Sequence, residues 1–170
     1  MSDIEYKYDE TELKNIIKFL SKNHTVKIGV LGKSKKGVYE GIGAVELATV
    51  HEFGSFDERI PRRSFLEKTK EKKMMKYHLW LINNHEKIYK KIADGKGEQF
   101  LNLIGKKWEA WVKQTFMEEG PGWKKLADIT IQRRREKARR AAGNETAETF
   151  PILRDTSALM RSITHEVISD

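Results

Sequence analysis

The sequence has 170 residues, 38% of them apolar and 34% charged, which predicts one folded domain over residues 1–170 with a highly charged surface. It has no cysteine, no apolar run near the roughly 20 residues of a membrane span and no signal-like N-terminus, so we expect no disulfide, no thiolate site, no membrane contact and cytoplasmic synthesis. The formal net charge of +8 indicates an anionic partner, and it fits nucleic acid and an acidic protein neighbour equally well.

The first part of the chain predicts a helix, a strand and a loop. Within residues 1–24, apolar residues at helical spacing indicate an amphipathic helix that ends near Asn23. These apolar residues are Leu13, Ile16, Ile17 and Leu20. Residues 25–31 alternate between apolar side chains and polar or small ones, which predicts a half-buried strand. The glycines that follow, up to Gly43, indicate a mobile, hairpin-like loop.

Three helices are expected in the middle of the chain. A short one begins near Ala44 and is ended by Gly54, because glycine readily closes a helix C-terminus. A long, highly charged helix is predicted over 64–93, and a second long helix over 98–119. The first long helix has a discontinuous apolar stripe of Phe65, Met75, Leu79, Ile82 and Ile88. The second has a regular stripe of Leu101, Ile104, Trp108 and Trp111. We assign its two tryptophans, together with Trp123, to packing or to a subunit interface.

The last part of the chain predicts a basic helix over 128–142, a short helix over 156–162 and a final strand over 165–169. We expect this strand to pair with the strand over 25–31. The fold class is therefore predicted to be α+β, with a small antiparallel sheet and several helices, two of them long.

Enzyme motifs are incomplete in this sequence. Gly32, Lys33 and Ser34 resemble the end of a phosphate-binding loop, but Lys27 stands where that loop needs a glycine. His51 and Glu52 begin like a zinc-protease helix, yet Ser55 stands where the second histidine is required. We therefore expect no enzyme activity, no cofactor and no metal.

The basic helix carries the strongest physical signal of function. Its candidate contact residues for DNA or a partner are Arg133, Arg134, Arg135, Lys137, Arg139 and Arg140. They spread over more than one helical face and are not interleaved with aromatic residues, which argues against stacking on bases. Contact with a phosphate backbone, as in the lining of a DNA channel, fits this pattern, and so does a face exposed only to solvent.

Three segments, taken in order, resemble the virion morphogenesis and tail-completion proteins of tailed phages, a group that includes head-to-tail joining (neck) proteins. The first has His51, Glu52, Phe53 and Gly54, followed by Ile60-Pro61-Arg62-Arg63-Ser64-Phe65. The second has Trp123, Leu126 and Thr130, and the third has Ile152-Leu153-Arg154-Asp155-Thr156 with Leu159 and Ile163. The resemblance covers residues 25–170, although Ser64 and Ser157 replace the proline and the glycine that are usual in the family.

Backbone conformation and helix capping predict structural roles for these motif residues. Gly54 can end a helix in a left-handed conformation, Pro61 stiffens the approach to the next helix, and Asp155 or Thr156 can cap the last helix. The resemblance implies a structural virion protein at the neck or tail top, made in the host cytoplasm. It implies a homo-oligomeric ring, with six subunits as the expectation, which binds connector and tail proteins and surrounds double-stranded DNA. The alternative is a protein that binds nucleic acid without sequence preference through its basic helix.

Overall fold

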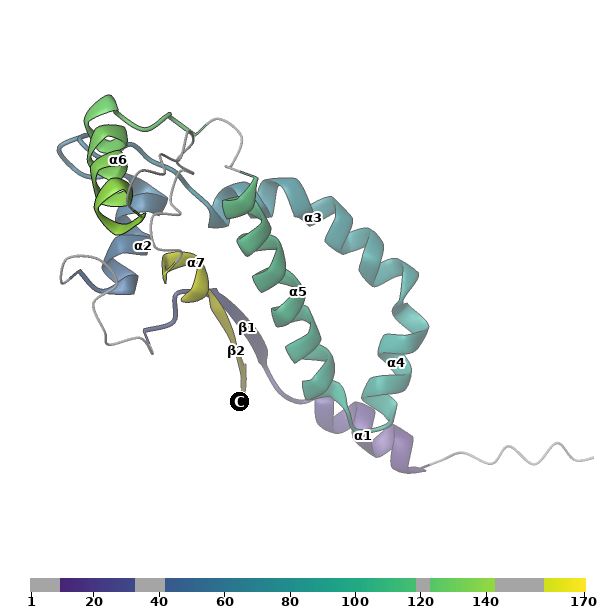
Figure 1. Ribbon diagram of the computed structural model, residues 1–170. Coiled ribbons are helices and arrows are strands. Elements are labelled where there is room, and N and C mark those ends of the chain that lie inside the picture. Colours follow the sequence, from purple (N-terminus) through teal and green to yellow (C-terminus); the bar gives the residue numbers. More distant parts are fainter. Residues whose placement is uncertain (1–9, 33–41, 119–122, 143–157) are drawn as a thin grey trace, which may run out of the picture.

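The computed structural model describes residues 10–32, 42–118, 123–142 and 158–170, and its elements are arranged along one long helix, α5 (Figure 1). The helices are α1 (Glu10–Leu20), α2 (Ala44–Phe53), α3 (Leu66–Asn83), α4 (His85–Ala93), α5 (Gly97–Met117), α6 (Asp128–Ala142) and α7 (Ala158–Arg161). The strands are β1 (His24–Gly29) and β2 (Thr164–Ser169). The α+β class is confirmed, and no helix among the described residues is long and apolar enough to cross a membrane.

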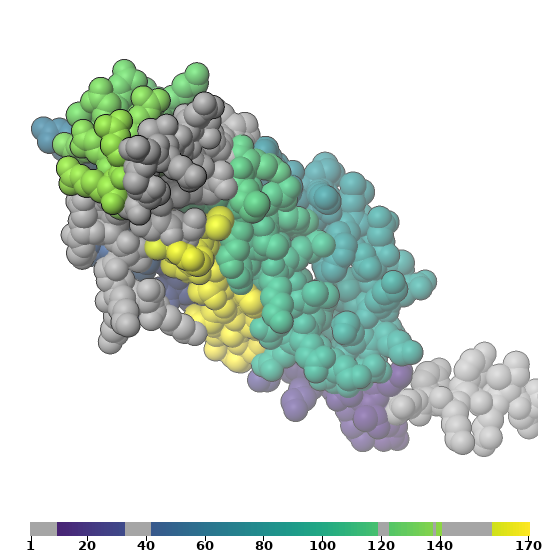
Figure 2. Space-filling model, viewed as in Figure 1, coloured from purple at the N-terminus to yellow at the C-terminus, as the bar shows by residue number. Residues whose placement is uncertain are grey.

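The two strands form an antiparallel ribbon, as the alternating sequence patterns predicted. Their register pairs His24 with Ser169 and Gly29 with Thr164. Val26 and Ile28 are half-buried while Lys27 between them is exposed, so β1 turns one face toward the protein. The ribbon packs on α5, and Figure 2 shows β2 lying against that helix.

Helix α5 joins two hydrophobic clusters. Near its C-terminal end, Val112 and Phe116 pack with Phe65 from the loop before α3 and with Ile163 before β2. Near its N-terminal end, a second cluster is built on Phe100, Leu101 and Ile104, with half-buried aromatic side chains from α3 and α5 around it. These aromatic residues are Tyr77, Trp80 and Trp108. Because both clusters share α5, this helix sets the position of the ribbon on one side and of α3 and α4 on the other.

The prediction of one helix over 64–93 was wrong. The segment first becomes helical at Leu66 and is divided at Asn84, which has φ −120° and ψ 11°. The Asn84 side chain donates to the carbonyl of Trp80 at 2.7 Å, and its backbone N–H donates to Leu81 at 3.2 Å. Asparagine often competes in this way with the backbone of a helix. The break turns α4 against α1 and the start of α5 (Figure 1).

The predicted apolar stripes of two helices do not face the core. On α3 the side chains of Met75, Leu79 and Ile82 are all more than half exposed, and the helix packs instead through Thr69, Tyr77 and Trp80. On α1 the same is true of most of the predicted face, whose exposed members are Leu13, Ile17 and Leu20. The structure therefore leaves two apolar surfaces uncovered on the described part of the chain.

Candidate functional site

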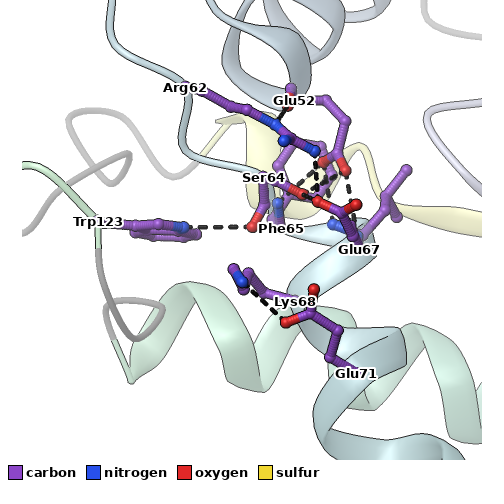
Figure 3. A network of polar contacts seen from close by, with 9 residues as sticks. Glu52, Arg62, Ser64, Phe65, Glu67, Lys68, Glu71 and Trp123 are labelled. Atoms are coloured by element: carbon purple, nitrogen blue, oxygen red, sulfur yellow. Dashed lines mark hydrogen bonds and ion pairs between the residues drawn. The ribbon is translucent and has the colours of Figure 1, made fainter.

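The carboxylate of Glu52 caps a helix to which it does not belong. Glu52 lies in the last turn of α2 and is only 7% exposed. One carboxylate oxygen accepts the backbone N–H groups of Phe65 and Leu66 at 2.9 and 3.0 Å (Figure 3). The other accepts the N–H of Glu67 at 3.1 Å and the hydroxyl of Ser64 at 2.6 Å.

These bonds fix the start of α3 against the end of α2. The first N–H groups of a helix have no partner inside it, and a negative charge there also complements the helix dipole. Phe65, at the N-cap position, cannot supply a side-chain acceptor. Glu52 therefore acts as a capping residue from 13 positions earlier in the chain.

The loop between α2 and α3 begins with a turn that requires Gly54. This glycine ends α2 as predicted, but with φ 86° and ψ 167° it lies in an extended region at positive φ and not in the left-handed helical region that we expected. That region is almost restricted to glycine. A Cβ atom there would lie 3.3 Å from the backbone nitrogen of Arg62. Beyond the turn, the N–H of Arg63 donates to the carbonyl of His51 at 2.8 Å and closes the loop.

Hydrogen bonds of Arg63 and Trp123 join the loop before α3 to residues 123–127. The Arg63 guanidinium is buried and donates to the carbonyls of Lys124 and Lys125 at 3.2 and 3.4 Å. The indole N–H of Trp123 donates to the carbonyl of Ser64 at 3.2 Å (Figure 3). The ring of Trp123 packs edge-on against Phe116, with centroids 6.2 Å apart.

Residues from all three motif segments therefore meet in one place. The first segment contributes Phe65 to the hydrophobic cluster at the end of α5, the second contributes Trp123, and the third contributes Leu159 and Ile163. We call this meeting point the α2–α3 junction. Asp155 and Thr156, which we expected to cap the last helix, lie outside the described residues. Pro61 is half-buried in the loop, whereas Phe53 is 71% exposed.

The basic helix α6 lies beside the junction, at one end of the molecule (Figure 2), and has the bounds that the sequence predicted. Its candidate residues differ in exposure. The exposed ones are Arg133, Arg135, Lys137, Arg139 and Arg140. Arg134 is partly buried, and its charge acts on His51 and Arg63.

His51 is held neutral at this contact. Burial, reinforced by the positive charges of Arg63 and Arg134, lowers its pKa from 6.5 to about 4. Burial also lowers the pKa of Arg63, with Arg134 as the second cause. The buried Nδ1 atom of His51 has no hydrogen-bond partner among the described residues. The positive charges of Arg63 and Arg134 therefore lie close together beside His51.

The polar side chains of the junction hold segments together. Both oxygens of Glu52 are engaged by donors from α3 and the two residues before it. Within residues 10–32, 42–118, 123–142 and 158–170, no three histidine or carboxylate side chains are grouped so as to hold a metal ion. Lys33 and Ser34 of the nucleotide-loop interpretation fall outside those ranges.

We found no protein-family model that matches the chain, and no curated protein or solved structure that is significantly similar to it.

Proposed function

We propose that this chain is a structural subunit of the head-to-tail junction of a tailed-phage virion, in the neck or in tail completion, where copies form a ring around the DNA channel. The observation that carries the proposal is the α2–α3 junction. The motif residues Glu52, Arg63 and Trp123 use their polar atoms to bind backbone groups of other segments. Motif residues whose polar atoms bind the backbone of the same chain are expected in a structural protein and not in an enzyme.

The exposed arginines of α6 support a place next to DNA. Arg133, Arg135, Arg139 and Arg140 can approach phosphates, and the helix has no aromatic residue with which to stack on bases. A subunit that lines a channel must let DNA of any sequence pass, so contacts with the backbone alone suit this role. The uncovered apolar side chains of α1 and α3 support subunit contacts.

Two measurements test the proposal together: mass spectrometry of purified virions for the presence of the chain, and native mass spectrometry of the isolated protein for its oligomeric state. We expect a small fixed copy number in virions and a closed oligomer, with six subunits as the first expectation. A protein that is absent from virions and monomeric at every concentration would overturn the proposal.

The exposed basic face also favours a second candidate, a free protein that binds nucleic acid without reading sequence. This candidate predicts an affinity that falls steeply with salt, with a slope of about −0.9 for each phosphate neutralised on double-stranded DNA. It further predicts binding by the monomer. The two functions are separated by location, because only the ring subunit stays with the mature particle.

A further inference from the structure

The loop after α2 holds a phenylalanine side chain in the solvent. Phe56 is fully exposed, although the loop around it is fixed by its own hydrogen bonds. The hydroxyl of Ser55 donates to the carboxylate of Asp57 at 2.7 Å and accepts the N–H of Ile60 at 2.8 Å. The N–H of Ser55 donates to the carbonyl of Ile60 at 3.0 Å and closes the loop. A large apolar ring on a loop of fixed shape is a preorganised anchor for a partner.

Glu58 adds backbone strain and a free charge beside this ring. In the part of the chain that the structure describes, it is the only non-glycine residue with a positive φ, at 57°. Such conformations cost free energy and cluster where function requires them. The carboxylate of Asp57 is bound by Ser55 and by Arg59, the latter at 3.2 Å, whereas that of Glu58 has no partner among the described residues. The loop therefore presents an apolar ring next to an unpaired negative charge.

A pocket of about 300 Å³ lies between α1, the turn from α4 to α5 and the paired ends of β1 and β2. We call it the α1–α5 pocket. Its apolar lining comes from Phe19 and Ile92. Phe19 stacks on the ring of His24, with centroids 4.1 Å apart, and lies directly over Gly97. The His24 ring is itself held by a hydrogen bond of 2.8 Å to the hydroxyl of Ser169, so this wall of the pocket is preformed.

The charge and the size of the α1–α5 pocket suit the loop. Lys18 and Lys22 line it together with one carboxylate, that of Glu98. Within the ranges that the structure describes, neither lysine has a carboxylate partner. A closed cavity of about 150 Å³ already binds benzene, so a pocket of this volume can accept a phenyl ring. The pocket therefore combines an aromatic wall with unpaired positive charge.

We propose that Phe56 of one copy inserts into the α1–α5 pocket of a second copy, with Glu58 beside Lys18 and Lys22. The phenyl ring then contacts Phe19, and the opposite charges steer the two copies together and set their orientation. The contact cannot form within one chain, because the loop lies at the α6 end of the molecule and α1 lies at the other end (Figure 1).

The proposed contact joins two different surfaces of the chain. Such a head-to-tail contact builds a closed ring or an open filament, whereas a contact between identical surfaces stops at a dimer. One loop in one pocket is smaller than the roughly 800 Å² per partner of a standard interface, so a single contact is expected to be weak. Closing a ring makes the last contact intramolecular and strengthens the assembly. The inference rests on the proposed ring and names the surfaces that form it.

Cysteine cross-linking tests the pairing without background, because the chain has no cysteine of its own. The variants R59C, in the loop, and E98C, in the pocket, leave Phe56, Glu58 and both pocket lysines in place. Because docking holds the two sulfurs at a high effective concentration, their mixture should cross-link at least about tenfold faster than a control mixture of R59C with L79C, exposed on α3. R59C and E98C combined in one chain should give a ladder that ends at the subunit number of the ring.

Further changes in the R59C and E98C mixture separate docking from chance collision. Phe56→Ala should lower the cross-linking rate to that of the control mixture, and thermal unfolding should be unchanged because the side chain is exposed. Ile129→Ala, at an exposed position of α6, is the matched control and should have no effect. Glu58→Lys should also slow the reaction, and Lys22→Glu in the other copy should restore part of the rate.

Three results would overturn the inference. The first is a rate for the R59C and E98C mixture no higher than in the control mixture, at the highest protein concentration reached. The second is full cross-linking after Phe56→Ala, and the third is a homodimer of R59C alone that forms faster than the mixed dimer. The proposed function fails separately: a chain found in virions without the cross-link leaves the function standing, and a ladder from a protein absent from virions leaves only the interface.

Discussion

The carboxylate of Glu52, one residue before the end of α2, accepts the backbone N–H of Leu66, the first residue of α3, at 3.0 Å. One buried side chain thus sets the angle between two helices that a loop with glycine, serine and proline would otherwise leave loosely defined. Trp123 and the basic helix α6 lie at the same α2–α3 junction.

Replacing Glu52 with glutamine should be strongly destabilising. The variant keeps the shape but loses the charge, and it turns an NH2 group toward N–H donors that need an acceptor. We expect the free energy of unfolding to fall by about 2–4 kcal/mol, measured by urea denaturation. Glu136→Gln, at an exposed position of α6, is the matched control and should change stability by less than about 0.5 kcal/mol. Equal effects of the two changes would show that the cap is unimportant.

His51 predicts a specific loss of stability in mild acid. Its pKa is about 4 in the folded protein and 6.5 in the unfolded chain, so between these values only the unfolded chain binds the proton. Stability from this residue is complete above pH 6.5 and falls as the pH drops toward 4, by about 3 kcal/mol in all.

The comparison with His51→Gln isolates this effect, because all other titrating groups are shared by the two proteins. Urea denaturation between pH 4 and pH 7.5 should show the wild type losing more stability than the variant as the pH falls. Parallel curves for the two proteins would contradict a buried, neutral His51.

Gly105 should not tolerate alanine, although alanine is normally the better helix residue by about 1 kcal/mol. A Cβ atom at this position of α5 would lie 2.2 Å from the ring of His165 on β2. Gly105→Ala is therefore expected to lower the free energy of unfolding by about 1–3 kcal/mol through overpacking. Gln99→Ala, at an exposed position of the same helix, should be neutral or slightly stabilising. Adding His165→Ala to Gly105→Ala should recover part of the loss, and no recovery would place the strain elsewhere.

The exposed arginines of α6 should bind DNA without contributing to the fold. Changing Arg133, Arg135, Arg139 and Arg140 to glutamine is expected to leave thermal stability nearly unchanged, since these side chains are exposed. The slope of log affinity against log salt should become shallower by about 0.9 for each phosphate that the variant no longer neutralises, measured with duplexes of unrelated sequence. Lys70, Lys76, Lys87 and Lys90 of α3 and α4 are the control set, and an equal decrease in that variant would mean that net charge alone matters.

The sequence predicted the elements that are defined by local signals. Helix α6 has the expected bounds because its basic run carries no breaker, and the two strands paired as their alternation indicated. Gly54 ended α2 at the expected residue. These features depend on neighbours in the chain, which periodicity and glycine placement report directly.

The features that were missed depend on contacts between distant residues. The helical pattern continues across Asn84, so it gave no sign of the break that this side chain creates. The role of Glu52 needs donors 12 to 15 residues later in the chain, which the local pattern around Glu52 does not reveal. A helix with two apolar sides, such as α3, also does not reveal from its sequence which side meets the core.

The central proposal is a ring at the head-to-tail junction, and the most direct test is electron microscopy of purified virions that carry a label on this chain. The proposal predicts label in a single ring between head and tail, with the α6 end of each subunit toward the DNA channel. Label that is scattered over the particle, confined to the capsid shell or absent from virions would contradict it.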